Sequence, residues 1–183
     1  DEDSRADRSP GEFYQLDLEM SFVEQEDVFN AVEPVIYDVF KEFGQKQVVK
    51  EFKKISFKEA MLKYGTDKPD LRFDLEIMDV TKIFQNSEFK IFANNIKNGC
   101  VVRGIPGTNC GSRAIADKMN SWAQSLGAPG MGYIIFNDGE GKGPIANVLG
   151  EEKVKNLKDQ FNLNDGDALF FSCAKEKEAS DLA

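Results

Sequence analysis

Residues 1–23 read DEDSRADRSPGEFYQLDLEMSFV and form the most informative stretch of the chain. Residues 1–12 are polar and show no periodicity, which is typical of a loop. From residue 13 onward apolar and polar side chains alternate, and this period of two predicts a β-strand over residues 13–23. One face of that strand would carry the apolar side chains of Tyr14, Leu16, Leu18, Met20 and Phe22.

The opposite face of this strand is polar and has two possible interpretations. It carries an amide, two carboxylates and a hydroxyl, from Gln15, Asp17, Glu19 and Ser21. Such a face is most simply a solvated surface. The same groups are also what a site for a cation or an ammonium group needs.

Beyond the strand, the pattern becomes helical. Apolar residues recur at helical spacing over 25–43, with Pro34 inside the pattern and Gly44 at its end, and they predict a helix. Ser56 and Glu59 have the spacing of a capping box, which predicts a short helix ending near Gly65. Residues 66–72, TDKPDLR, have no periodicity and are expected to form an ordered loop.

From about residue 74 the elements become shorter and glycine becomes more frequent. The expected elements are helices at 79–85, 112–126 and 151–161, strands at 88–94, 99–105, 131–137 and 167–174, and a last helix from 176. These elements have their own apolar set and predict an α+β domain. The sequence therefore divides into residues 1–73 and residues 74–183.

Two glycine-rich stretches do not match nucleotide-binding motifs. Residues 127–132 are not in the G-x-G-x-x-G order and precede a strand. Residues 137–144 contain a lysine after glycine, but no serine or threonine follows it. Both stretches are expected to be turns.

Composition excludes several kinds of chemistry. The chain of 183 residues has no histidine, so it holds no Ser-His-Asp triad and no H-E-x-x-H zinc site of its own. Its net charge of −9 is uneven, because residues 1–40 contain twelve acids and two bases, Arg5 and Arg8. An acidic chain argues weakly against non-specific binding to nucleic acid.

Three further features of the sequence each lead to a separate expectation. They are the cysteines, the length of the apolar runs and the identity of the first residue. Cys100, Cys110 and Cys173 form no C-x-x-C pair, and we expect reduced thiols in a cytoplasmic protein. No apolar run has membrane-spanning length, so we expect no membrane partner. Because the first residue is Asp1 and not Met, we also expect a fragment of a longer protein.

Residues 1–17 and 66–72 together resemble a known family. The first stretch is similar to the second conserved motif of class II aminoacyl-tRNA synthetases, in particular the bacterial aspartate-specific type. In that family a loop containing Arg-Ala-Asp-Arg is followed by a returning strand with Glu-Phe-x-Gln. The stretch TDKPDLR also resembles a family motif, and residues 74–183 resemble the domain that these enzymes insert between their second and third motifs, which is shared with amidotransferase B subunits.

The resemblance implies the following roles for the residues of the motif. Contacts to ATP would come from Asp1, Glu2, Ser9, Phe13 and Gln15, with Phe13 stacking on adenine. Asp17 would bind the α-ammonium of aspartate. The tRNA acceptor end would contact Asp3, Arg5 and Arg8, since arginine can grip phosphate or a guanine edge. Ser9 stands where many relatives have glutamine, and Gly11 is an additional residue of the loop.

The resemblance also implies the reaction and its partners. The parent protein would activate L-aspartate with ATP and Mg²⁺, and would then transfer it to tRNA as a homodimeric cytoplasmic enzyme. This chemistry depends on positioning and charge stabilisation and requires no histidine. The motif arginine before Asp1 and the first and third motifs are not in this sequence. The chain therefore holds no complete catalytic set or metal site, and we expect it to be inactive alone.

Residues 74–183 allow a second hypothesis. They could form a non-catalytic module that binds a partner or positions tRNA, or a structural appendage without such a role. Their fifteen acids and twelve bases give no strong electrostatic footprint for RNA.

Overall fold

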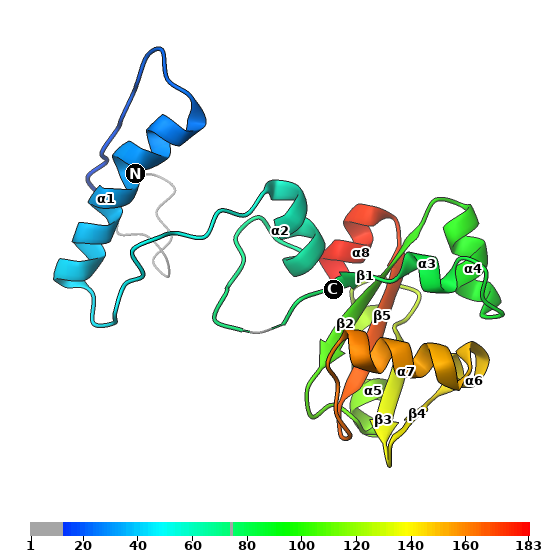
Figure 1. Cartoon of the computed structure of the whole chain (residues 1–183). Helices are drawn as coiled ribbons and strands as arrows, with labels where there is room; N and C mark the ends of the chain where they lie inside the picture. Colours follow the sequence, from blue (N-terminus) through cyan, green and yellow to red (C-terminus); the bar gives the residue numbers. More distant parts are fainter. Residues whose placement is uncertain (1–12, 74) are drawn as a thin grey trace. The chain divides into compact units, whose positions relative to one another are not determined.

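The computed structural model describes residues 13–73 and 75–183, and the chain divides into two compact units at Lys54/Ile55 (Figure 1). This division by contacts lies upstream of the one predicted at 73/74. The predicted division concerns the catalytic and inserted domains of a family, and it stays a prediction.

The first unit contains one helix, α1 (Gln25–Phe43), within its described residues. At its start the backbone N–H of Glu24 donates to Asp27 at 2.9 Å, and at its end the N–H of Gly44 donates to the carbonyl of Phe40 at 2.8 Å. The predicted helix is therefore confirmed, with Pro34 inside it. None of its residues is buried.

The predicted strand over residues 13–23 is wrong. These residues have no regular secondary structure, and Tyr14 and Phe22 are fully exposed. A strand needs a neighbouring strand to satisfy its backbone N–H and C=O groups. The described part of the first unit offers none, so the alternating pattern has neither a hydrogen-bonding partner nor a core to face.

The second unit begins with α2 (Phe57–Tyr64), as the capping-box spacing predicts. The Ser56 hydroxyl accepts from the N–H of Glu59 at 3.2 Å, and Gly65 ends the helix in the left-handed conformation at φ 66°. Residues 66–73 then form the expected loop.

A five-stranded sheet forms the centre of the second unit. Its strands are β1 (Met78–Asp79), β2 (Val101–Gly107), β3 (Gly132–Asn137), β4 (Glu140–Lys142) and β5 (Ala168–Ala174). Their order is β1-β2-β5-β3-β4, and every pairing is antiparallel. Because β5 is central, it supplies Leu169 and Phe171 to one apolar cluster and Ala168 and Phe170 to another.

Helices cover both faces of this sheet. The remaining helices are α3 (Thr81–Phe84), α4 (Lys90–Lys97), α5 (Arg113–Ser125), α6 (Pro144–Leu149), α7 (Glu151–Gln160) and α8 (Glu176–Leu182). Residues of α3, α4, α6 and α7 join the cluster around Phe171, and residues of α5 and α8 join the cluster around Phe170. Figure 1 shows α7 in front of the sheet and α5 behind it. The predicted α+β class is confirmed.

The expected strand at 88–94 is wrong, because this segment lies largely within α4. Phe92 and Ala93 are buried, while Phe89 and Ile96 pack against the same cluster. These positions are three and four residues apart, which is the spacing of one helix face.

The other expected elements from residue 99 onward are confirmed within a few residues. Residues 137–144, expected to be a turn, contain a tight hairpin with Asp138 and Gly139 at positive φ, followed by β4. Two positive φ values are typical of a type I′ turn. The short elements β1, β4 and α6 have no counterpart in the sequence prediction.

Candidate functional site

Six of the nine residues predicted for the site lie outside the described part of the chain. They are Asp1, Glu2, Asp3, Arg5, Arg8 and Ser9. The roles expected for them stay predictions.

The other three predicted residues, Phe13, Gln15 and Asp17, are exposed. The amide Nε2 of Gln15 donates to Oδ1 of Asp17 at 2.6 Å, so the two side chains lie on the same side of the backbone. The Phe13 ring is 59% exposed. A carboxylate that accepts one amide hydrogen bond keeps further lone pairs for an ammonium group.

The loop of residues 66–72 is shaped by two local ion pairs. Lys68 pairs with Asp67 at 2.9 Å, and the guanidinium of Arg72 pairs with both carboxylate oxygens of Asp70. The hydrogen bonds from the Arg72 side chain and backbone lower the pKa of Asp70 to about 2. This loop is therefore ordered by charge-assisted hydrogen bonds and not by burial.

The described residues contain no group of three or more Cys, Asp or Glu side chains that could hold a metal ion. The Mg²⁺ that the family resemblance implies has no recognisable site among residues 13–73 and 75–183.

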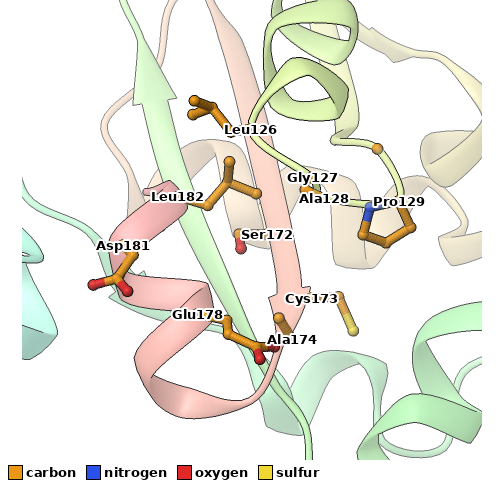
Figure 2. Close-up of a pocket in the computed structure, with 11 residues that line it drawn as sticks. Leu126, Gly127, Ala128, Pro129, Ser172, Cys173, Ala174, Glu178, Asp181 and Leu182 are labelled. Carbon is orange, nitrogen blue, oxygen red and sulfur yellow. The ribbon is translucent and has the colours of Figure 1, made fainter.

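A pocket in the second unit was not predicted from the sequence. It has a volume of about 360 Å³ and lies between the loop after α5, the end of β5, and α8 (Figure 2). Its lining includes Ser172, Cys173, Glu178 and Asp181. No motif marks it, because its residues come from three elements that only the fold brings together.

None of the helices in the described ranges is both long enough and apolar enough to span a membrane.

Comparison with known proteins identifies the family. A family model described as tRNA synthetases class II (D, K and N) matches residues 1–178. The chain is 55% identical over its whole length to an aspartate--tRNA(Asp/Asn) ligase of Ehrlichia chaffeensis, covering 32% of that protein. It is 54% identical over its whole length to the ligase of the same name from Wolbachia sp. subsp. Brugia malayi, covering 31% of it.

A third relative covers slightly less of the chain. The aspartate--tRNA(Asp/Asn) ligase of Ehrlichia ruminantium (strain Welgevonden) is 56% identical over 93% of the chain and 30% of its own length. The chain thus spans about a third of the length of the curated relatives that it matches. It belongs to the class II tRNA synthetase family for D, K and N, and corresponds to a section of the aspartate-specific ligases in it.

Proposed function

We propose that this chain is the part of an aspartate–tRNA ligase that carries the ATP- and aspartate-binding motif of residues 1–17 and the following α+β insertion. The observation that carries the proposal is the identity of 54–55% to aspartate--tRNA(Asp/Asn) ligases over the whole chain. These matches cover 100% of the chain and so include both motifs, the acidic stretch of residues 1–17 and the loop of residues 66–72.

In this proposal, the motif of residues 1–17 positions the reactants. Phe13 offers a flat apolar face for adenine, and Asp1, Glu2, Ser9 and Gln15 supply hydrogen-bonding groups for ATP. Asp17 holds the aspartate ammonium and so directs the substrate carboxylate toward the α-phosphorus of ATP. That carboxylate oxygen bonds to the phosphorus as pyrophosphate leaves, which forms aspartyl-adenylate. Class II enzymes generally use ATP and Mg²⁺, and the Mg²⁺ would neutralise phosphate charge with ligands supplied elsewhere in the ligase.

The second half-reaction places tRNA at the same motif. Arg5 and Arg8 would contact the acceptor end, together with Asp3, and the terminal ribose hydroxyl would displace AMP from the adenylate. The close contact between Gln15 and Asp17 supports the proposal, since one polar side chain orients the other. The complete enzyme would be a cytoplasmic homodimer.

The relatives' names indicate a broader tRNA substrate. Three relatives are named as ligases for both tRNA(Asp) and tRNA(Asn). We propose that the full-length ligase containing this chain aspartylates both.

The test is ATP–pyrophosphate exchange and tRNA charging by the full-length ligase. Exchange should depend on added aspartate, and transcripts of both tRNA(Asp) and tRNA(Asn) should accept aspartate. Exchange driven equally by lysine or asparagine would contradict the aspartate assignment, and charging of tRNA(Asp) alone would contradict the dual substrate. The 183-residue chain by itself should give no aspartate-dependent exchange, and such a signal would contradict the proposal that its catalytic set is incomplete.

A second candidate function concerns residues 74–183 alone, as a module that binds a partner or positions tRNA. It is supported by the second unit having its own sheet and two apolar clusters, which a separate module requires. Deleting 74–183 from the full-length ligase should then raise the KM for tRNA and leave aspartate-dependent exchange intact. An unchanged KM and charging rate would contradict the positioning role.

A further inference from the structure

The pocket at the end of β5 lies where β5 extends beyond the part that pairs with β3. In the β3–β5 pairing, Gly132 lies opposite Phe171, and β3 begins at Gly132. β5 extends to Ala174, paired on its other side with Val101 of β2. The last three residues of β5 therefore have a strand neighbour on the β2 side and none on the β3 side.

The alternation of hydrogen bonds places the backbone of Cys173 at this open edge. The N–H of Phe136 donates to the carbonyl of Asp167 at 2.9 Å, so Asp167 faces the β3 side. Successive residues of an antiparallel strand direct their N–H and C=O groups to opposite neighbours. Cys173 lies six residues after Asp167, which is an even number, so its N–H and C=O also face the β3 side.

The pairing of β2 with β1 and with β5 leads to the same assignment of which β5 residues face β2 and which face β3. The N–H of Val80 in the segment after β1 donates to the carbonyl of Val102 at 2.9 Å, so Val102 faces β1 and Arg103 faces β5. Arg103 lies opposite Ser172, which must then face β2. Within the described ranges, the backbone hydrogen bonds made outside the sheet ladders do not include Cys173.

The pocket is built around this open edge. Three consecutive residues of β5, Ser172–Ala174, line it, as expected for a cavity that runs along a strand edge. Figure 2 shows the loop of residues 127–129 on one side of β5 and α8 on the other. The Ser172 hydroxyl is fully buried and has no hydrogen-bond partner among the described residues. A buried hydroxyl without a partner is an unused hydrogen-bonding group.

The walls and rim of the pocket define the chemistry of an occupant. Leu126, Pro129 and Leu182 supply apolar surface, and Glu178 and Asp181 supply two exposed carboxylates from α8. Neither carboxylate forms an ion pair with a lysine or arginine in the described part of the chain. No basic residue lines the pocket, so a phosphate group would meet only negative charge there.

We propose that this pocket, which we call the β5 slot, binds an extended basic peptide segment of a partner protein. The peptide backbone pairs with the N–H and C=O of Cys173 and continues the sheet where β3 is absent, as in recognition by strand addition. An apolar side chain of the peptide packs between Leu126 and Leu182, and a lysine or arginine two residues away, on the same face of the peptide strand, reaches Glu178 and Asp181. This inference does not depend on the function proposed above.

The proposal can be tested with the 183-residue chain and a synthetic peptide. The probe is acetyl-KTVTK-amide, in which the lysines and the valine share one face, with acetyl-ETVTE-amide as the acidic counterpart. Acetyl-KPVPK-amide keeps the charge and the valine but lacks the N–H groups of the two threonines. Trp122 is the only tryptophan of the chain and precedes Leu126 by one turn of helix, so its fluorescence reports on the slot. The basic peptide should change this fluorescence saturably and less strongly at high salt. The acidic and proline peptides should bind at least about tenfold more weakly.

Matched variants separate the slot from non-specific attraction. Glu178→Gln with Asp181→Asn should weaken binding of the basic peptide about tenfold, since two exposed charge pairs are lost. Glu151→Gln with Glu152→Gln removes the same charge from two exposed acids of α7 and should leave binding unchanged. Circular dichroism would check that both variants stay folded.

Several outcomes would overturn the proposal. They are equal binding of the basic and acidic peptides, equal binding of the proline peptide, or equal loss in both double variants. Binding of a single-stranded RNA that is lost with the Glu178/Asp181 variant would assign the slot to nucleic acid. A dimer in sedimentation that the same variant dissociates would assign it to a second copy of the chain.

Discussion

At the scale of single residues, Asp70 shows how a neighbouring side chain changes the pKa of a carboxyl group. Hydrogen bonds from Arg72 lower its pKa from 3.8 to about 2. A carboxyl group with a lowered pKa in the folded state stabilises that state above pH 3.8, and the contribution is lost as the pH falls toward 2. In an NMR titration, the Asp70 carboxyl carbon should therefore have its midpoint near pH 2. Arg72→Gln should return it toward 3.8, and an unchanged midpoint would contradict the assigned cause.

Arg103 is a buried charged residue of the second unit. Its side chain is 3% exposed and pairs with Asp79 of β1 and Glu176 of α8. Partial burial acts to raise the pKa of Asp79, but hydrogen bonds from Thr81 and the Arg103 charge hold that pKa below its ordinary value. Asp79→Asn would replace a charged acceptor by a neutral one and leave the guanidinium with one carboxylate partner, Glu176 at 3.4 Å.

Asp79→Asn should therefore lower the free energy of unfolding by about 1–3 kcal/mol, the usual cost of a buried polar group that loses its partner. Urea denaturation measures it. Glu176→Gln, which changes the more exposed partner, should cost less than Asp79→Asn. The reverse order would mean that the pair with Asp79 is not the main partner of Arg103.

At the scale of elements, the start of α2 depends on one hydroxyl. Ser56 accepts the N–H of Glu59, and its removal leaves that donor without a partner in the chain. Ser56→Ala should therefore cost about 1 kcal/mol of stability, as for other N-cap serines. Ser121→Ala, inside the exposed face of α5, is the matched control and should cost nothing measurable. Equal effects in thermal unfolding would contradict a capping role.

The strand predictions for residues 13–23 and 88–94 are wrong for different physical reasons. Residues 13–23 have a strand pattern, but a pattern cannot supply the neighbouring strand that pairs with it. Residues 88–94 contain apolar residues that fit both periods over a short window, and packing of Phe92 against Phe84, which itself packs against Phe171, favours the helix. By contrast, helices α1, α2 and α5 were predictable. They have N-cap residues such as Ser56 and Ser112, or a long apolar face with helical spacing.

Only the part of the candidate site that is formed by residues close together in the sequence was predictable. Gln15 and Asp17 are two residues apart, so their contact follows from the backbone alone. The β5 slot was not predictable, since it depends on where β3 begins relative to β5 and on α8 lying beside β5. Pairing register of this kind is set by the complete sheet and not by any one segment.

At the scale of the whole molecule, the two units differ in how their apolar side chains are covered. In α1, apolar side chains such as Val35, Val39 and Phe43 are exposed and none is buried. In the second unit, seven-residue strands β2 and β5 pair along their full length, and β5 is almost entirely buried. Most helical stability in proteins comes from burial of an apolar face, and no residue of α1 is buried in the described structure.

Hydrogen exchange should therefore separate the two units of the 183-residue chain. Amides of α1 should exchange at nearly the rate of an unfolded peptide, while those of β2 and β5 exchange only through global unfolding. Mass spectrometry of peptic peptides measures both. Protection of α1 equal to that of β5 would mean that the apolar face of α1 is covered in solution.

The assignment of Asp17 to the aspartate ammonium can be tested most directly in the full-length ligase, by aspartate-dependent ATP–pyrophosphate exchange. Asp17→Asn should raise the KM for aspartate by at least about tenfold, because a charge-assisted hydrogen bond is lost, and should change the KM for ATP far less. Asp159→Asn, an exposed acid of α7, should change neither. A KM for aspartate that is the same in Asp17→Asn and in the unaltered ligase would contradict the account.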